Sequence, residues 1–179
     1  TDGNGTYVAY NMVAGAYRLV PELTEYDFAP TEINTTVTNA DVIGQNFTGT
    51  LRTYTVSGRV TEDGVGKAGV TVADSTGTYS AVTDADGNYT LTGVPSGRYT
   101  LTPTLQYYKF LPSSTTVVVA GAAVTGQDFQ AVADTFSISG SVVDFNGSKV
   151  QGVRVTDGEH TAITNEAGQY TISGVRAGT

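Results

Sequence analysis

Apolar and polar residues alternate along most of this chain, in short runs that turn-forming residues interrupt. In the run from Tyr54 to Val60, Val56 and Val60 fall on one face of an extended segment, and Thr55 and Arg59 fall on the other. No stretch has the 3.6-residue apolar period of an amphipathic helix. For the best-defined part of the chain the pattern predicts short strands over 54–60, 69–73, 79–83, 89–91, 98–102, 107–110, 115–120 and 126–132.

Two Asp-Gly pairs stand between these predicted strands. Asp63-Gly64 predicts a turn, and Asp86-Gly87 predicts a β-hairpin, because glycine adopts positive φ at little cost. Turns that recur about every 8–12 residues are typical of a β-sandwich.

The chain also repeats itself at a spacing of 82 residues. Residues 1–49 and 83–131 share eighteen identities without a gap, among them Tyr7 with Tyr89 and Phe47 with Phe129. A third copy begins at the same spacing, since Ser139-Gly140 follows Ser57-Gly58. A period of this size indicates an array of like units.

These spacings divide the chain into one whole repeat and two partial ones. We expect residues 1–52 to be the C-terminal part of a β-sandwich repeat, residues 53–134 a complete repeat, and residues 135–179 the N-terminal part of a further repeat. The predicted fold class is all-β, with tandem immunoglobulin-like or prealbumin-like Greek-key β-sandwich repeats of about 82 residues.

Composition and charge exclude several classes of function. The formal net charge is -8 with nine Lys plus Arg, so nucleic acid is not an expected partner. Cysteine is absent, which excludes disulfides, thiol catalysis and Cys-based zinc sites. The sequence contains no run of about 18 apolar residues, so it predicts no membrane span. No catalytic motif is apparent, so we expect no enzymatic activity.

Several segments together resemble carboxypeptidase regulatory-like domains, which are prealbumin-like sandwiches close to the Cna-B-type repeats of bacterial surface proteins. The segments that carry the resemblance are 56–60, 69–72, 83–91, 94–101 and 124–129. By analogy, the resemblance implies a stalk, spacer or building block of a secreted or surface-anchored protein. Some relatives bind glycans or accompany peptidases.

Asp84 and Asp86 are the candidate metal ligands. With the backbone of Asn88 they could form a calcium loop, because hard cations prefer clustered carboxylate and carbonyl oxygens. The alternative is a turn whose Asp and Asn side chains accept local hydrogen bonds. The residues equivalent to these carboxylates differ between the three copies, whereas the Gly that follows them is the same in each. We therefore favour the turn and expect no bound cofactor.

Four further groups of residues could carry chemistry. A Lys–Asn crosslink occurs in some Cna-B-type relatives, but the positions of Lys67, Lys109 and Lys149 favour ordinary amines. Most of the eleven Tyr fall at inward positions, which favours core packing over a glycan-binding platform. His160 is a lone solvated loop residue. Five Asn-X-Ser/Thr sequons are compatible with a secreted surface, namely those at Asn4, Asn34, Asn46, Asn88 and Asn146.

The partial repeats lead to the functional hypothesis. Residues 135–179 and 1–52 together make one full repeat with roughly one strand in duplicate. Either the chain is a window of a longer covalent array, or copies complement each other head to tail; the duplicated strand favours the array. We therefore expect a structural segment of an extracellular or cell-surface filament, stalk or adhesin, whose partners are neighbouring repeats or further copies. The alternative is a glycan- or calcium-binding accessory module.

Overall fold

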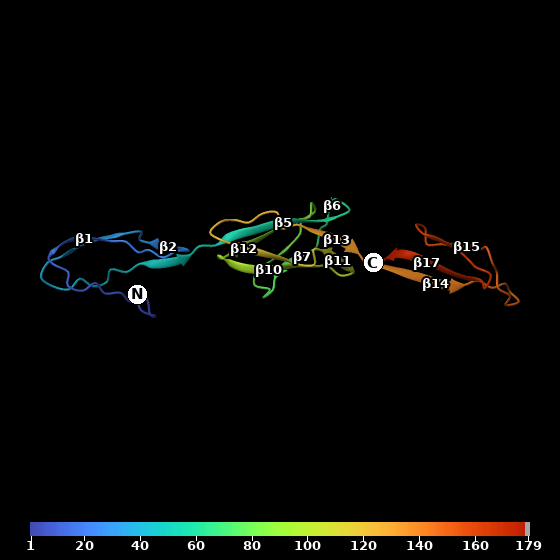
Figure 1. Ribbon diagram of the computed structural model, residues 1–179, viewed down its shortest axis with the longest axis horizontal. Helices are drawn as coiled ribbons and strands as arrows, with labels where there is room; N and C mark the ends of the chain where they lie inside the picture. The colour runs from blue at the N-terminus through green and yellow to red at the C-terminus, as the bar shows by residue number, and fades with distance from the viewer. Residues whose placement is uncertain (178–179) are drawn as a thin grey trace.

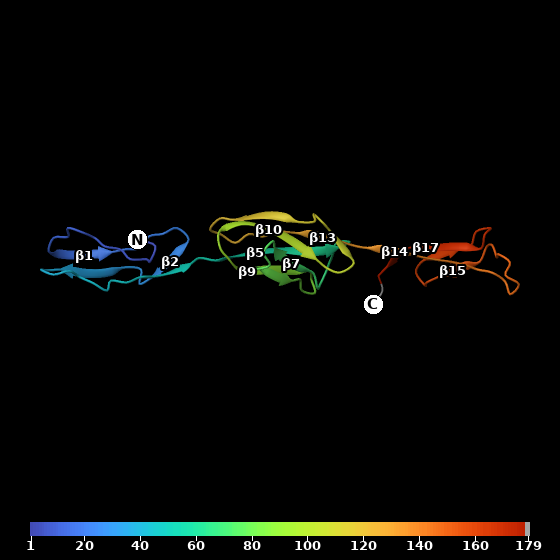
Figure 2. The same cartoon turned by 90° about the horizontal axis from the view of Figure 1, so that it is seen from below.

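The computed structural model describes residues 1–177, and every regular element in that range is a β-strand. Figure 1 shows the strands in three groups that follow one another along a single long axis. We call them the N-terminal unit (β1–β4), the central unit (β5–β13) and the C-terminal unit (β14–β17). The view from below in Figure 2 shows the same row of three units.

The central unit is a two-layered sandwich of nine strands. One sheet has the order β12-β10-β7-β8; the other has the order β11-β13-β5-β6, with β9 on β5 as well. The strands are β5 (Tyr54–Glu62), β6 (Val65–Gly66), β7 (Thr71–Asp74), β8 (Ser80–Val82), β9 (Asn88–Val94), β10 (Gly97–Thr104), β11 (Tyr108–Leu111), β12 (Thr115–Val119) and β13 (Phe129–Ala133).

Alternation along these strands creates the core. Val56 and Val60 of β5 are fully buried, as the alternating pattern predicts. They pack against inward residues of both sheets, which include Val70, Val72, Tyr89, Leu91, Val94, Leu101, Phe110, Val117, Val119, Phe129 and Ala131. The all-β sandwich expected from the sequence is therefore confirmed.

Two details of the strand prediction were wrong. Asp86-Gly87 does not close a hairpin, because β8 pairs with β7 in one sheet and β9 pairs with β5 in the other. The chain crosses between the layers there, and a Cβ on Gly87 would lie 2.2 Å from the Val60 carbonyl oxygen. The last strand begins at Phe129, not at 126, and it runs parallel to β5.

The turn at Asp63-Gly64 is confirmed. Both residues have positive φ, 52° and 83°, as a two-residue type I′ connection requires. The turn joins β5 to the short strand β6, with Glu62 opposite Val65. The sequence pattern did not predict β6, because a two-residue strand has no detectable alternation.

The N-terminal unit has four strands in two pairs. They are β1 (Gly15–Leu19) with β3 (Ile33–Val37), and β2 (Tyr26–Ala29) with β4 (Thr48–Leu51). Both pairs keep the register of the central unit. Gly15 pairs with Val37 as Gly97 pairs with Val119, 82 residues later.

The C-terminal unit corresponds to the other half of a sandwich. Strand β14 (Thr135–Ser141) pairs with β17 (Gln169–Arg176), and β15 (Arg154–Thr156) pairs with β16 (Thr161–Ile163). These pairs match β5 with β9 and β7 with β8. The division into three repeats at 1–52, 53–134 and 135–179 stays a prediction, and the common register is consistent with it.

Candidate interface between the units

The contacts between neighbouring units are the candidate functional site of this chain. At the first junction, the link of Arg52 and Thr53 joins β4 to β5. Glu25, which has φ of 70°, lies in the loop before β2 and reaches the central unit. Its Oε2 accepts hydrogen bonds from Ser96 Oγ at 2.6 Å and from Tyr54 OH at 3.2 Å. A carboxylate of one unit is thus held by two hydroxyls of the next.

The second junction uses the same positions with different chemistry. Asp134 alone links β13 to β14. Tyr107, with φ of 63°, stands 82 residues after Glu25, and Phe136 stands 82 residues after Tyr54. Their rings meet edge to face with centroids 6.3 Å apart. An aromatic contact therefore replaces the carboxylate–hydroxyl contact of the first junction.

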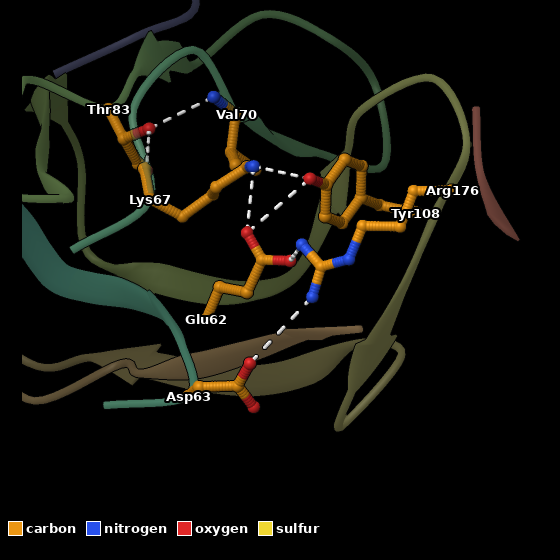
Figure 3. A network of polar contacts seen from close by, with 7 residues as sticks. All are labelled: Glu62, Asp63, Lys67, Val70, Thr83, Tyr108 and Arg176. Carbon is orange, nitrogen blue, oxygen red and sulfur yellow. Dashed lines mark hydrogen bonds and ion pairs between the residues drawn. The ribbon is translucent and has the colours of Figure 1, made fainter. Parts of the chain in front are cut away.

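The second junction also holds an ionic network, drawn in Figure 3. Glu62, at the end of β5, accepts from Lys67 Nζ at 2.8 Å through Oε2 and from Arg176 Nη1 at 2.9 Å through Oε1. Tyr108 OH bonds to the Lys67 ammonium, which also lies 4.1 Å from the centre of the Tyr108 ring. Because Arg176 ends β17, this network ties the C-terminal unit to the central unit.

Charge pairing perturbs both ionisable groups at the centre of this network. The hydrogen bond from Lys67 lowers the pKa of Glu62; burial opposes this, and attraction to Lys67 and Arg176 reinforces it. Burial alone would lower the pKa of Lys67, but its bonds to Glu62 and Tyr108 outweigh burial and raise it. Both groups are therefore held in their charged forms.

A buried threonine fixes the loop that carries Lys67. Thr83 Oγ1 donates to the Lys67 carbonyl at 2.7 Å and accepts from the Val70 amide at 2.9 Å (Figure 3). Thr164 makes the same two bonds in the C-terminal unit, to the Val150 carbonyl and from the Val153 amide. We call this pair of bonds the threonine latch.

An ion pair lies at each link, and its acidic and basic residues exchange places between the two junctions. Arg52 Nη2 lies 2.7 Å from Asp27 Oδ1, and the residues 82 positions later, Asp134 and Lys109, lie 2.9 Å apart. The hydrogen bond from Arg52 lowers the pKa of Asp27. The same geometry is thus built with acid and base exchanged.

Asp84 and Asp86, the candidate calcium ligands, lie in the turn between β8 and β9. Asp84 Oδ1 accepts from the amides of Asp86 and Asn88 at 3.0 and 2.8 Å. Asp2 and Asn165 make the equivalent pairs of bonds in the other two units. Within residues 1–177 no group of three or more His, Cys, Asp or Glu side chains is placed to hold a metal ion. Calcium binding at Asp84 and Asp86 stays a prediction.

Residues 55–132 match the family model described as the carboxypeptidase regulatory-like domain. The resemblance expected from the sequence is confirmed for these residues. The matched region coincides with the central sandwich, so both junctions lie at its ends.

Three solved structures are similar to parts of this chain. The TIE protein of Bacillus anthracis is 14% identical with a TM-score of 0.50, over 78% of this chain and 30% of that protein. A streptococcal ancillary pilin is 16% identical with a TM-score of 0.41, over 93% of this chain and 65% of the pilin. A chain of a mutant type II cohesin–X-dockerin complex from Acetivibrio cellulolyticus is 26% identical with a TM-score of 0.36, over 45% of this chain and 58% of that chain.

The chain spans less than two thirds of the length of each of these structures. The likeness to the TIE protein is one of fold. A search of curated proteins found no match. Carboxypeptidase regulatory-like domains and this sandwich fold are of a regulatory or structural kind that is not typical of enzymes. Among residues 1–177 no helix is long and apolar enough to cross a membrane.

The remaining residues singled out in the sequence lie apart from one another. Lys67 bonds to Glu62, Lys109 pairs with Asp134, and His160 Nδ1 lies 3.1 Å from Asp157 Oδ2. Tyr89 is buried in the core of the central unit, and burial raises its pKa. Tyr10 is 79% exposed. The Asn residues of all five sequons are exposed.

Sequence reasoning missed the junction residues. Glu25, Ser96 and Arg176 lie in loops or at strand ends, where no periodicity singles out a side chain. One signal was available in the repeat itself. Asp27 and Arg52 change to Lys109 and Asp134, which is a coupled exchange of charge at two positions. Such an exchange between copies indicates a spatial contact.

Proposed function

We propose that this chain is a structural segment of an extracellular or cell-surface filament, stalk or adhesin, in which sandwich units are joined end to end. The observation that carries the proposal is the row of three units with side-chain contacts across both junctions (Figure 1). Links of two residues and one residue leave little freedom between the units. Units joined in this way keep a fixed spacing and orientation along the row, as a spacer requires.

The contacts at the junctions support a stiff connection over a flexible one. Glu25 is held by two hydroxyls at the first junction. At the second, Arg176 bonds to Glu62, whose side chain is only 16% exposed, and lies 3.9 Å from Asp63. Partly shielded ion pairs are screened less by salt than exposed ones. Each junction therefore has at least one polar contact that resists bending.

The experiment is small-angle X-ray scattering of the chain, followed by electron microscopy of concentrated material. We expect a rod-like distance distribution and, at high concentration, threads with a regular axial repeat. A compact particle, or units that tumble independently about their links, would refute the structural role. The alternative of a glycan- or calcium-binding module stays a prediction. It requires a rise in melting temperature with added glycans or calcium.

A further inference from the structure

Asn-X-Thr/Ser sequons are more frequent in this chain than its composition predicts. Five of its eight asparagines stand two positions before a Thr or Ser, and none of the residues between is Pro. Thr and Ser together make up 41 of the 179 residues, so chance would place about two of eight asparagines in a sequon. The excess indicates that composition alone does not explain these asparagines.

The internal repeat does not account for the excess either. The residue 82 positions after Asn34 is Thr116, and the residue 82 positions before Asn88 is Thr6. No two of the five sequons are separated by 82 residues, so none is a copy of another through the repeat. Each unit therefore has sequons at positions of its own.

Strand geometry places the sequon of the central unit on the surface of a closed sandwich. Asn88 is the first residue of β9, and Thr90 follows on the same face of the strand. Both are exposed, whereas Tyr89 between them is buried in the core. The carboxamide and the hydroxyl therefore face solvent together, while the residue between them holds the strand in place.

The other four sequons are exposed as well. Their asparagines and the Thr or Ser that follows are exposed in every case. The equivalent positions of the central unit, where both sheets are packed together, are exposed too. For Asn4, Asn34, Asn46 and Asn146 these positions are Asp86, Thr116, Asp128 and Gly64. A bulky group at each sequon is therefore compatible with the complete fold.

The side chains of the sequon asparagines contribute little to the fold. Asn4, Asn46, Asn88 and Asn146 each donate a local hydrogen bond through the backbone amide. Within residues 1–177 the side chains of these four make no hydrogen bond, and Asn34 Nδ2 makes one, to Glu32 at 3.3 Å. Most of these carboxamides are therefore free to carry a substituent.

The three asparagines outside sequons differ in this respect. Asn165 Oδ1 accepts hydrogen bonds from two backbone amides of its turn. Asn39 Oδ1 accepts from Thr38 Oγ1 at 3.3 Å. Asn11 has φ of 59°, which asparagine adopts more readily than most residues. Each of these three has a local structural reason to be asparagine, and the sequon residues lack one.

We propose that the sequons are sites of N-glycosylation, and that Asn88 is the modified residue of the central unit. The sugar donor is a lipid-linked oligosaccharide diphosphate. Asn88 Nδ2 forms a bond to the anomeric carbon of the sugar, and the bond from that carbon to the diphosphate oxygen breaks. The carboxamide gives up one proton, and the lipid diphosphate leaves. The proposal rests on the extracellular or cell-surface placement in the proposed function.

Peptide mass spectrometry of the chain isolated from the organism that makes it tests the proposal. We expect the peptide that contains Asn88 to carry an oligosaccharide on that residue. Peptides that contain Asn11, Asn39 or Asn165 should be unmodified, and they serve as internal controls because they come from the same molecules.

Three variants made in the same organism test whether the sequon itself is read. N88Q and T90A should each lose the oligosaccharide on β9, and T90S should keep it, because serine retains the hydroxyl. N165Q should leave the glycosylation pattern unchanged. In a host without N-glycosylation, N88Q should melt at the same temperature as the unsubstituted chain, since the Asn88 side chain makes no hydrogen bond within residues 1–177.

The outcomes separate this proposal from the structural role. Rods or threads whose Asn88 is unmodified would overturn glycosylation and leave the filament standing. A modified chain that forms neither rods nor threads would overturn the filament and leave glycosylation standing. An unmodified chain found inside the cell would overturn both. An oligosaccharide that survives in T90A would also overturn the proposal, because the hydroxyl would then play no part.

Discussion

Replacing Thr83 with Val removes the threonine latch without changing the shape of the side chain. Thr83 is 5% exposed, and its hydroxyl is bonded to the Lys67 carbonyl and to the amide of the fully buried Val70. The substitution leaves a buried amide and a carbonyl without these partners. Each unsatisfied group costs about 1–3 kcal/mol, so we expect T83V to lower the free energy of unfolding of the central unit by roughly 2–6 kcal/mol.

Differential scanning calorimetry of the whole chain measures this effect. For a unit of this size, 1 kcal/mol shifts the melting temperature by about 4–8 °C, so the transition of the central unit should fall by at least about 8 °C. Hydrogen exchange at the Val70 amide should accelerate in parallel. Thr83→Ser is the matched control, because it keeps the hydroxyl and loses only a methyl group, at a cost of about 1 kcal/mol.

Two results would refute this reasoning. A loss of less than about 1 kcal/mol in T83V would mean that water or relaxation satisfies both backbone groups. An equal loss in T83S would mean that the methyl group, not the hydroxyl, carries the effect. The equivalent T164V should lower only the transition of the C-terminal unit, since Thr164 makes the same bonds there.

Four further predictions follow from the junctions and the core. The pKa of Glu62 is lowered from its ordinary value of 4.5, so its ion pairs contribute fully above that pH and are lost as the pH falls through the lower folded value. Small-angle scattering should therefore show the second junction loosening in acid, and E62Q should abolish this pH dependence. E25A should broaden the distance distribution in scattering through the first junction, whereas E25Q, which keeps an accepting oxygen, should change it less. Y89F should cost about 1 kcal/mol in thermal unfolding, because it deletes the bond to Gln127 O. D84A should destabilise the central unit by about 1 kcal/mol with or without calcium; a calcium-dependent difference would favour the metal site over the turn.

The parts of the fold that sequence predicts are those governed by local rules. Alternation placed Val56 and Val60 inside, and Asp63-Gly64 supplied two residues that tolerate positive φ. Asp86-Gly87 carries the same local signal, yet its flanking strands belong to different sheets. Pairing partners are decided by the core as a whole, so a turn dipeptide does not reveal whether its strands are neighbours.

The junction contacts were beyond prediction for a related reason. The contacts of Glu25 and Arg176 with the central unit join positions 71 and 114 residues apart, and their meeting depends on how whole units are oriented. No local pattern encodes that orientation. The internal repeat gives an indirect signal of these contacts. The equivalent residues Glu25 and Tyr107 both have positive φ but differ in side-chain chemistry.

The parallel pairing of β5 with β13 has a mechanical consequence. The chain enters the central unit at the start of β5, leaves it at the end of β13, and the two strands are paired in parallel through Phe129 with Val60 and Gln130 with Thr61. Tension along the row pulls these strands in opposite directions past each other. The hydrogen bonds between them are then loaded together in shear instead of opening one after another. A tether built from such units would yield abruptly, at high force, instead of peeling gradually.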